Sequence, residues 1–155
     1  GGSQIQPAPF ALRNLYENES SCREPVLFII TPGSDPSSEL QEFAETVVGR
    51  QCFHELAMGG GQNDIAIELV KKASQKGEWV CLKNLHLVTS WLPSLEKEIK
   101  MLKPDKKFRL WLTSEPHSKF PSILLQSSLK ITYETPPGVK NNLMRTFSYV
   151  APSQE

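Results

Sequence analysis

The chain has 155 residues, 17 of them basic and 17 acidic, and therefore a formal net charge of zero at pH 7. This length suits one domain with a substantial hydrophobic core, and the balanced charge provides no overall field that would attract nucleic acid or an anionic membrane surface. No apolar run approaches the roughly 20 residues that a membrane-spanning helix needs, so we expect a domain that binds neither nucleic acid nor membrane.

Residues 1–24 are predicted to form a tag remnant followed by an N-terminal arm. Gly1-Gly2-Ser3 resembles the remnant of an expression tag, and no secretory signal follows it. The next stretch is polar, and its apolar run Phe10–Tyr16 predicts only one or two helical turns. The three cysteines share no metal-ligand spacing, so reduced intracellular thiols are expected.

The apolar run Val26–Ile30 predicts the first strand, and a helical pattern follows it. Asp35 is expected to cap that helix with its carboxylate, and Pro36 occupies the first helical position, which tolerates proline. The helix should end near Gly49. This order of strand, loop and helix is the setting that a phosphate-binding P-loop requires.

The loop in this setting lacks the residues that bind phosphate. In the pattern G-x-x-x-x-G-K-[ST], glycines allow close backbone approach, the lysine contacts phosphate and the hydroxyl binds magnesium. Counting from Gly33, Ser38 replaces the second glycine, Glu39 the lysine and Leu40 the hydroxyl residue. A carboxylate would repel a triphosphate where an ammonium group should attract it. The sequence therefore predicts a nucleotide-binding fold that does not bind nucleotide.

A second strand, Phe53–Met58, leads through Gly59-Gly60-Gly61 to a helix predicted from about Asp64 to Lys76 and closed by Gly77. The glycines could suggest the dinucleotide fingerprint G-x-G-x-x-G. That pattern would place Asp64 at its third glycine, where the carboxylate would lie close to an anionic pyrophosphate. A flexible turn is the preferred interpretation.

The third strand, Trp79–Leu82, is followed by Lys83 and Asn84 where an active P-loop enzyme carries two acidic residues. One of those carboxylates holds the metal and the other orients the attacking water. Lysine repels magnesium, and asparagine is not a base. A second element of the catalytic machinery is therefore also predicted to be lost.

The remaining segments continue the alternation of strands and helices. Ser90 is predicted to cap a third helix that ends before Pro104. Two more strands are expected over Phe108–Thr113 and Leu129–Tyr133, with helices over Phe120–Leu125 and from Val139 onward. This alternation predicts a three-layer α/β sandwich with a five-stranded parallel sheet.

Two other groups of residues are candidate sites. Residues 97–109 hold six basic and two acidic residues, which suits either an interaction with an acidic partner or the stabilisation of a helix C-terminus. The histidines, His54, His86 and His117, lack any metal-binding spacing, so neither a metal site nor a cofactor is expected.

Four blocks of the sequence resemble the sixth AAA+ module of dynein heavy chains. They keep the order and spacing of that family and span Pro25–Pro36, Trp79–Leu87 with Trp91-Leu92, Phe108–Thr113 and Pro136–Thr146. The resemblance covers roughly residues 25–150. Two stretches, Cys81–Val88 and Leu124–Glu134, look most like the cytoplasmic dynein 2 branch, the motors of retrograde intraflagellar transport.

The resemblance implies that residues 25–150 form the large α/β subdomain of an AAA+ module, with strand order 5-1-4-3-2, and that residues 151–155 are a tail. In this family a helical small subdomain and a C-terminal region follow. Six modules form one ring, the first is the main ATPase, and the fifth and sixth lack nucleotide sites. Thr113 would occupy the sensor position, which reads the γ-phosphate in active modules.

The function implied by the resemblance is a non-catalytic, ring-closing module that relays shape changes between its neighbours. Its partners would be the adjacent AAA+ modules of the same heavy chain and, through the parent complex, other dynein subunits and microtubules. Cytoplasm, cytoskeleton and cilium are the expected locations. Two alternatives remain, an unusual NTPase and a protein-interaction domain that uses the basic 97–109 segment.

Overall fold

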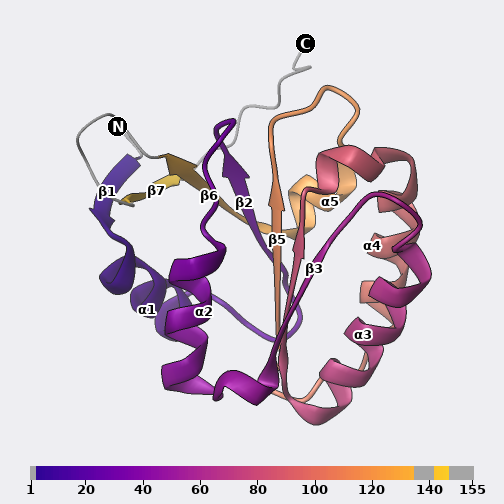
Figure 1. Cartoon of the computed structure of the whole chain (residues 1–155), viewed down its shortest axis with the longest axis horizontal. Helices are drawn as coiled ribbons and strands as arrows, with labels where there is room; N and C mark the ends of the chain where they lie inside the picture. Colours follow the sequence, from indigo (N-terminus) through magenta and orange to yellow (C-terminus); the bar gives the residue numbers. More distant parts are fainter. Residues whose placement is uncertain (1–2, 135–141, 147–155) are drawn as a thin grey trace.

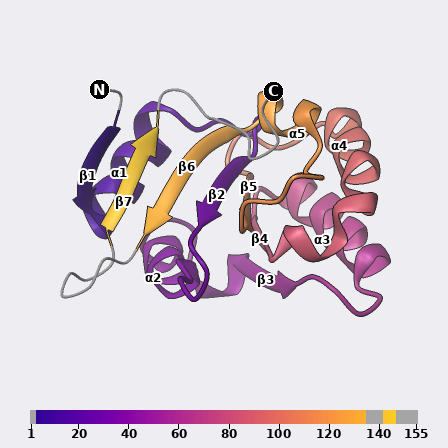
Figure 2. The same ribbon diagram turned by 90° about the horizontal axis from the view of Figure 1, so that it is seen from above.

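The computed structural model describes the backbone of residues 3–134 and 142–146, and the side chains of residues 12–133. Within these residues, helices cover both faces of one seven-stranded sheet (Figure 1). The strands lie in the order β1-β7-β6-β2-β5-β4-β3, which can be followed across the sheet in Figure 2.

The strands are β1 (Ser3–Pro7), β2 (Val26–Ile30), β3 (Phe53–Ala57), β4 (Trp79–Lys83), β5 (Arg109–Ser114), β6 (Leu129–Glu134) and β7 (Asn142–Thr146). The helices are α1 (Ala8–Asn18), α2 (Ser37–Val47), α3 (Asn63–Lys76), α4 (Leu92–Met101) and α5 (Ser122–Ser127). Two 3-10 segments, η1 (Arg50–Cys52) and η2 (Leu85–Trp91), connect them.

The five strands from β6 to β3 are all parallel, and their order β6-β2-β5-β4-β3 is the predicted order 5-1-4-3-2. At the centre, Phe28 lies opposite Thr113 on one side and Ile131 on the other. The predicted three-layer α/β sandwich with a five-stranded parallel sheet is therefore confirmed. The antiparallel strands β7 and β1 extend it beyond β6.

Alternation along β2 divides the core into two layers. Val26, Phe28 and Ile30 pack with α1 and α2, whereas Leu27 and Ile29 pack with α3, α4 and α5. All five side chains are buried. A strand that is buried on both faces has no polar side to present, which explains its unbroken apolar sequence.

A row of aromatic rings fills the layer beneath α1 and α2. The ring centroids of Trp79 and Trp111 lie 5.1 Å apart, and Tyr16 and Phe43 contact Trp79 at 5.2 and 5.8 Å. The indole N–H of Trp79 donates to the carbonyl of Lys107 at 2.9 Å. The buried Nε1 of Trp111 has no partner among the described residues.

The segment before β2 is more structured than the expected arm. It contains β1 and the three-turn helix α1, where the sequence predicted one or two helical turns. Leu12 and Leu15 of α1 are 2% and 4% exposed and belong to the core layer beneath α2. Tertiary packing of this apolar side stabilises a helix that its local sequence predicts only weakly.

The helix predicted from Val139 is wrong, because the structure has the strand β7 over Asn142–Thr146. This strand pairs antiparallel with β6 on one side and β1 on the other. Pairing with two neighbours satisfies its backbone groups, and this partnership is not visible in the local pattern. Val139 itself lies outside the described residues.

Ser90 does not cap the third helix. It lies within η2, and α4 begins at Leu92 with Trp91 at the cap position and no side-chain capping hydrogen bond. Pro93 in the first turn suits this start, since its missing N–H would have no partner there. The predicted helix closure at Gly77 is confirmed, with φ of 74° in the left-handed region.

Candidate functional site

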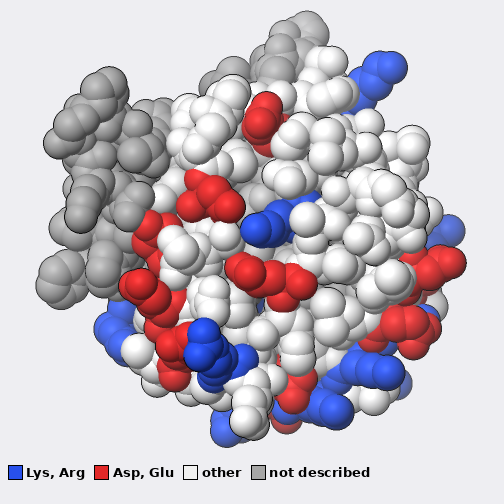
Figure 3. All heavy atoms as spheres, in the orientation of Figure 1, with Lys and Arg blue, Asp and Glu red and all other residues white. Residues whose placement is uncertain are grey.

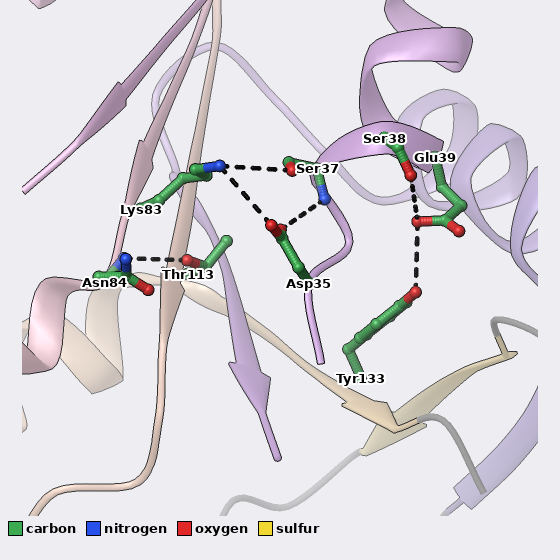
Figure 4. Close-up of polar contacts among 8 residues, drawn as sticks. All are labelled: Asp35, Ser37, Ser38, Glu39, Lys83, Asn84, Thr113 and Tyr133. Atoms are coloured by element: carbon green, nitrogen blue, oxygen red, sulfur yellow. Dashed lines mark hydrogen bonds and ion pairs between the residues drawn. The ribbon is translucent and has the colours of Figure 1, made fainter. Parts of the chain in front are cut away.

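The residues named from sequence as a degenerate nucleotide site come together at the carboxyl ends of β2, β4 and β5. The loop after β2 carries Gly33, the first turn of α2 carries Ser38, Glu39 and Leu40, and Lys83, Asn84 and Thr113 lie at the neighbouring strand ends. Figure 4 shows Lys83 directed toward Asp35 and Ser37, Glu39 directed toward Tyr133, and Thr113 beside the backbone of Asn84. In open α/β sheets this edge is where ligands bind.

The loop after β2 is a tight turn closed by its own polar groups. The Ser34 N–H donates to the carbonyl of Thr31 at 2.9 Å, and the two side-chain hydroxyls lie 2.7 Å apart. Gly33 has φ of 88°, and a Cβ built on it would meet no atom within 4 Å. Glycine is therefore favoured here by the backbone conformation, not by close approach of another group.

Asp35 binds the amino end of α2. Its Oδ1 accepts the N–H of Ser37, the first residue of the helix, at 3.0 Å. The cap position by backbone geometry is Pro36, one residue later than the sequence predicted. The predicted contact between the Asp35 carboxylate and a free helix N–H is nevertheless present.

Lys83 extends from the end of β4 toward the same carboxylate. Its Nζ lies 3.7 Å from Asp35 Oδ2 and 3.5 Å from Ser37 Oγ. Partial burial opposes ionisation of Asp35, but hydrogen bonds from the Ser37 N–H and hydroxyl, together with the charge of Lys83, outweigh it and lower the Asp35 pKa. The cation of this site thus comes from β4 and is paired with a carboxylate of the loop.

The residues at the P-loop lysine and hydroxyl positions contact other parts of the protein instead. The Tyr133 hydroxyl of β6 donates to Glu39 Oε1 at 3.2 Å, and the Ser38 hydroxyl lies 3.4 Å from the same oxygen. Leu40 is fully buried in the core layer beneath α2. An apolar side chain in the core offers no oxygen that could bind a magnesium ion.

Thr113 holds the end of β4. Its Oγ1 accepts the N–H of Asn84 at 3.1 Å. Asn84 adopts the left-handed conformation with φ of 65°, which asparagine tolerates better than most residues. The hydroxyl at the sensor-like position therefore supports the turn from β4 into η2.

His86 also lies at this edge, although no sequence pattern places it there. Its Nδ1 accepts the N–H of Glu115 at 3.1 Å, and its Nε2 lies 3.8 Å from the Glu115 carboxylate. The contact links η2, which follows β4, to the residue after the adjacent strand β5. No local pattern indicates it, because the two residues lie far apart in sequence.

The groups at this edge pair with one another. The cation of Lys83 lies beside the Asp35 carboxylate, and the hydroxyls of Thr31 and Ser34 bind each other. The described residues contain no group of three or more His, Cys, Asp or Glu side chains placed to hold a metal ion. None of the described helices is long and apolar enough to cross a membrane. The arrangement stabilises the ends of three strands and the start of one helix.

Comparison with known proteins gives a consistent result. The family model described as dynein heavy chain region D6 P-loop domain matches residues 21–132. Cytoplasmic dynein 2 heavy chain 1 of Homo sapiens is 55% identical over 154 residues, which are 99% of this chain and 4% of that protein. The protein of the same name from Tripneustes gratilla is 62% identical over 129 residues, which are 83% of this chain and 3% of that protein.

A solved structure supports the fold independently of close sequence similarity. A DNA polymerase III gamma subunit-related protein from Thermotoga maritima matches with a TM-score of 0.58 at 14% identity. The match covers 84% of this chain and 47% of that chain. At this level of identity the likeness concerns the fold alone.

Proposed function

Because the chain belongs to the dynein heavy chain family as its D6 P-loop domain, we propose that it is a non-catalytic structural AAA+ module of a dynein motor ring. Its relatives include cytoplasmic dynein 2 heavy chains that are 55% and 62% identical to it. The chain spans about 4% of the length of the human relative, so motor activity would reside in other parts of a heavy chain.

In this proposal the module moves as a rigid body between neighbouring AAA+ modules of the same heavy chain. ATP hydrolysis in other modules changes the shape of the ring, and this module transmits the change without binding nucleotide itself. Two core layers packed against a central strand that is buried on both faces support the idea of a stiff unit. Residues 25–150 would form its large α/β subdomain.

The parent complex would be a microtubule minus-end-directed motor for retrograde intraflagellar transport, located in cytoplasm, cytoskeleton and cilium. The motivating observation is the identity to heavy chains named cytoplasmic dynein 2. Other dynein subunits and microtubules would be partners of the complex through parts of the heavy chain outside this sequence.

The ion pair between Lys83 and Asp35 carries the proposal that no nucleotide binds. In a working P-loop the ammonium group and the helix N-terminus both face phosphate. Here the Asp35 carboxylate accepts a helix N–H and lies 3.7 Å from Nζ of Lys83. Among the described residues, Lys83 is the only lysine at the strand ends of the site. A phosphate would have to displace this carboxylate or bind beside it against like-charge repulsion.

Titration calorimetry of the purified chain with millimolar Mg-ATP tests this step. We expect no saturable heat and no rise in melting temperature, because ligand binding to the folded state would raise it. A dissociation constant below about 100 µM, or roughly 5.5 kcal/mol of binding free energy, would refute the proposal.

The variant Glu39→Lys tests whether charge alone silences the loop. We expect it to leave ATP binding undetectable, because the second glycine, the hydroxyl residue and the acidic pair are still absent. The same calorimetric titration measures it, with Glu39→Gln as the control that removes the carboxylate without adding a cation. Saturable binding by Glu39→Lys alone would show that the loop geometry remains competent.

The relay role needs the whole heavy chain. Leu40→Ala leaves a cavity beneath α2, and we expect it to lower microtubule-stimulated ATPase while basal hydrolysis by other modules persists. Leu87→Ala, at a side chain that is 59% exposed, is the control. Equal stimulated rates for both variants and wild type would count against a relay through this module.

A further inference from the structure

Lysine side chains gather at the end of the molecule opposite the candidate site. Helices α3 and α4 run antiparallel to the central strands, so both end where β4 and β5 begin (Figure 1). Figure 3 shows basic side chains, with acidic ones among them, along this lower right-hand end. Six exposed lysines belong to these elements, namely Lys71, Lys72 and Lys76 of α3 and Lys103, Lys106 and Lys107 of the segment after α4. We call these six residues the lysine surface.

Hydrogen bonds fix the two parts of the lysine surface to each other. The Asp105 N–H donates to the carbonyl of Ser74 in α3 at 2.8 Å, and the Lys107 carbonyl accepts the indole N–H of Trp79 at 2.9 Å. A Cβ built on Gly77 would lie 2.8 Å from Asp105 Oδ1, so the segment passes close over the end of α3. The lysines are therefore held on one folded surface.

The lysine surface carries net positive charge, because its six lysines face two carboxylates, Glu98 and Asp105. Lys71 lies 3.7 Å from Glu98, and this is the ion pair that the structure gives for the lysine surface. The described residues supply no acidic partner for the ammonium groups of Lys72, Lys76, Lys103, Lys106 and Lys107. Lysines at a helix C-terminus interact favourably with the helix dipole. Lys106 and Lys107 lie beyond the end of α4, so this interaction does not account for them.

The lysine surface differs from the basic 97–109 segment seen in the sequence. Arg109 is 9% exposed, and its guanidinium donates to Ser20 Oγ and to the carbonyls of Lys106 and Phe108 at 2.8–2.9 Å. Burial lowers the Arg109 pKa, and the group is held inside the fold. Lys100 is paired with Glu96 at 2.9 Å. The lysine surface therefore contains only part of the basic 97–109 segment, and α3 supplies the rest of its lysines.

A shallow groove of about 300 Å³ lies between α3 and α4 beside these lysines. Its lining includes Ser74, Met101 and Leu102, together with Lys71 of α3, Glu98 of α4 and Lys103 of the segment after α4. Met101 is 68% exposed, the highest exposure among the large apolar side chains of the described residues. An apolar side chain open to solvent between ammonium groups suits a ligand that is apolar at one point and anionic around it.

We propose that this end of the molecule is a docking surface for an acidic protein segment that places an apolar side chain on Met101. The carboxylates of the segment would pair with the lysine surface, and the groove would take its apolar anchor. A polypeptide is favoured over nucleic acid because the groove contains an apolar contact at Met101, which an apolar side chain of a peptide can fill. This inference does not depend on the proposed function.

The probe is a fluorescein-labelled synthetic peptide with glutamates at helical spacing around a single leucine, titrated with the 155-residue chain and followed by fluorescence anisotropy. We expect binding that weakens about tenfold or more between 50 and 300 mM salt, because exposed charges are screened. The double variant Lys103→Glu/Lys106→Glu should lose binding at least about tenfold. Lys119→Glu, an exposed lysine on the loop before α5, is the matched control and should change affinity less than about twofold.

The apolar contact is tested with Met101→Ala, which should weaken binding about tenfold, while Ile123→Ala on α5, 47% exposed, should not. Absence of binding by wild type, or equal binding by the lysine variants, overturns the proposal. Equal or tighter binding of a single-stranded DNA oligonucleotide would make the surface a nucleic-acid site. A dimer in sedimentation that the lysine variants abolish would make the partner a second copy, which also overturns it.

Discussion

Asp35 performs two tasks at the loop after β2 that a bound phosphate performs in a working P-loop. Its carboxylate accepts the first N–H of α2 at 3.0 Å, and it lies 3.7 Å from the ammonium group of Lys83. An anion at the amino end of a helix is favourable whether it belongs to a ligand or to the chain. The fold thus retains the electrostatic arrangement of the site while its anion is a covalent part of the protein.

Asp35→Ala should lower the free energy of unfolding by about 0.5–2 kcal/mol, since a helix N–H loses its acceptor. Asp35→Asn is the matched control because it keeps a hydrogen-bond acceptor and removes only the charge. We expect Asn to retain most of the stability, because the ion pair is partly exposed and such pairs contribute little. Urea denaturation midpoints measure both, and an unchanged midpoint for Asp35→Ala would rule out the capping role.

The lowered pKa of Asp35 predicts a pH dependence of stability. The folded state binds the Asp35 proton less readily than the unfolded state, whose pKa is near the ordinary 3.8, so this contribution rises with pH. The contribution of Asp35 to stability is complete at pH values above the unfolded-state pKa. It is lost as the pH falls through the lowered pKa of the folded state. We expect the stability difference between wild type and Asp35→Asn to be constant from pH 7 to about 5 and to shrink below about 4. A difference that grows on acidification would contradict the assigned direction.

The sequence predicted which residues gather at this edge, but not how they pair. Gly33, Glu39 and Lys83 follow from the order of strands and helices, because the carboxyl ends of parallel strands share one edge. The contacts of Lys83 with Asp35 and of Tyr133 with Glu39 depend on side-chain directions across separate elements. These directions are set by packing, so no local pattern could have indicated them.

At the scale of the elements, Arg109 joins α1 to β5. Its guanidinium lies 4.8 Å from the ring centre of Tyr16 and donates to Ser20 Oγ at 2.8 Å, so one side chain contacts the end of α1 and the segment after it. The planar guanidinium can lie over the ring and donate to several acceptors at the same time, which a lysine ammonium group cannot match in this geometry. An apparently basic surface residue therefore acts as an internal connection.

Arg109→Lys should lower the free energy of unfolding by about 1.5–3 kcal/mol, because lysine cannot reach the three acceptors at once. Hydrogen exchange should accelerate in α1 more than in α3, which makes no contact with the guanidinium. Arg50→Lys, at a side chain that is 77% exposed, is the control and should change stability by less than about 0.5 kcal/mol. Exchange in α1 that matches wild type would show that the helix does not depend on this residue.

The elements that the sequence predicted well are those whose burial is uniform. β2 is a continuous apolar run, β4 is one as far as Leu82, and β5 is buried along its whole length. Helix α3 ends at a glycine in the left-handed conformation. The errors lie where a distant partner decides the conformation, as in β7, which is a strand because β1 and β6 lie beside it. At Ser90 the chain forms η2 first, and α4 begins only at Leu92.

At the scale of the whole molecule, α1 completes one core layer. Leu15 is 4% exposed in that layer, so Leu15→Ala should cost about 2–5 kcal/mol of unfolding free energy through the cavity it leaves. Leu87→Ala, at 59% exposure, should stay within about 0.5 kcal/mol of wild type. Thermal and urea denaturation measure the difference, and equal effects of the two substitutions would place α1 outside the cooperative core.

The position of β2 at the centre of the sheet has a consequence for synthesis of the chain. Val26 pairs with Trp111 and Leu129, so the second strand made is completed only by the fifth and sixth. Until those strands leave the ribosome, the uncharged run Val26–Ile30 has no partner and could associate with other exposed strands. Pro25 and Pro32 bracket this run, and proline interrupts the backbone pairing on which such association depends. Each proline therefore removes one backbone N–H from an end of the run at the stage when the future centre of the sheet is still exposed.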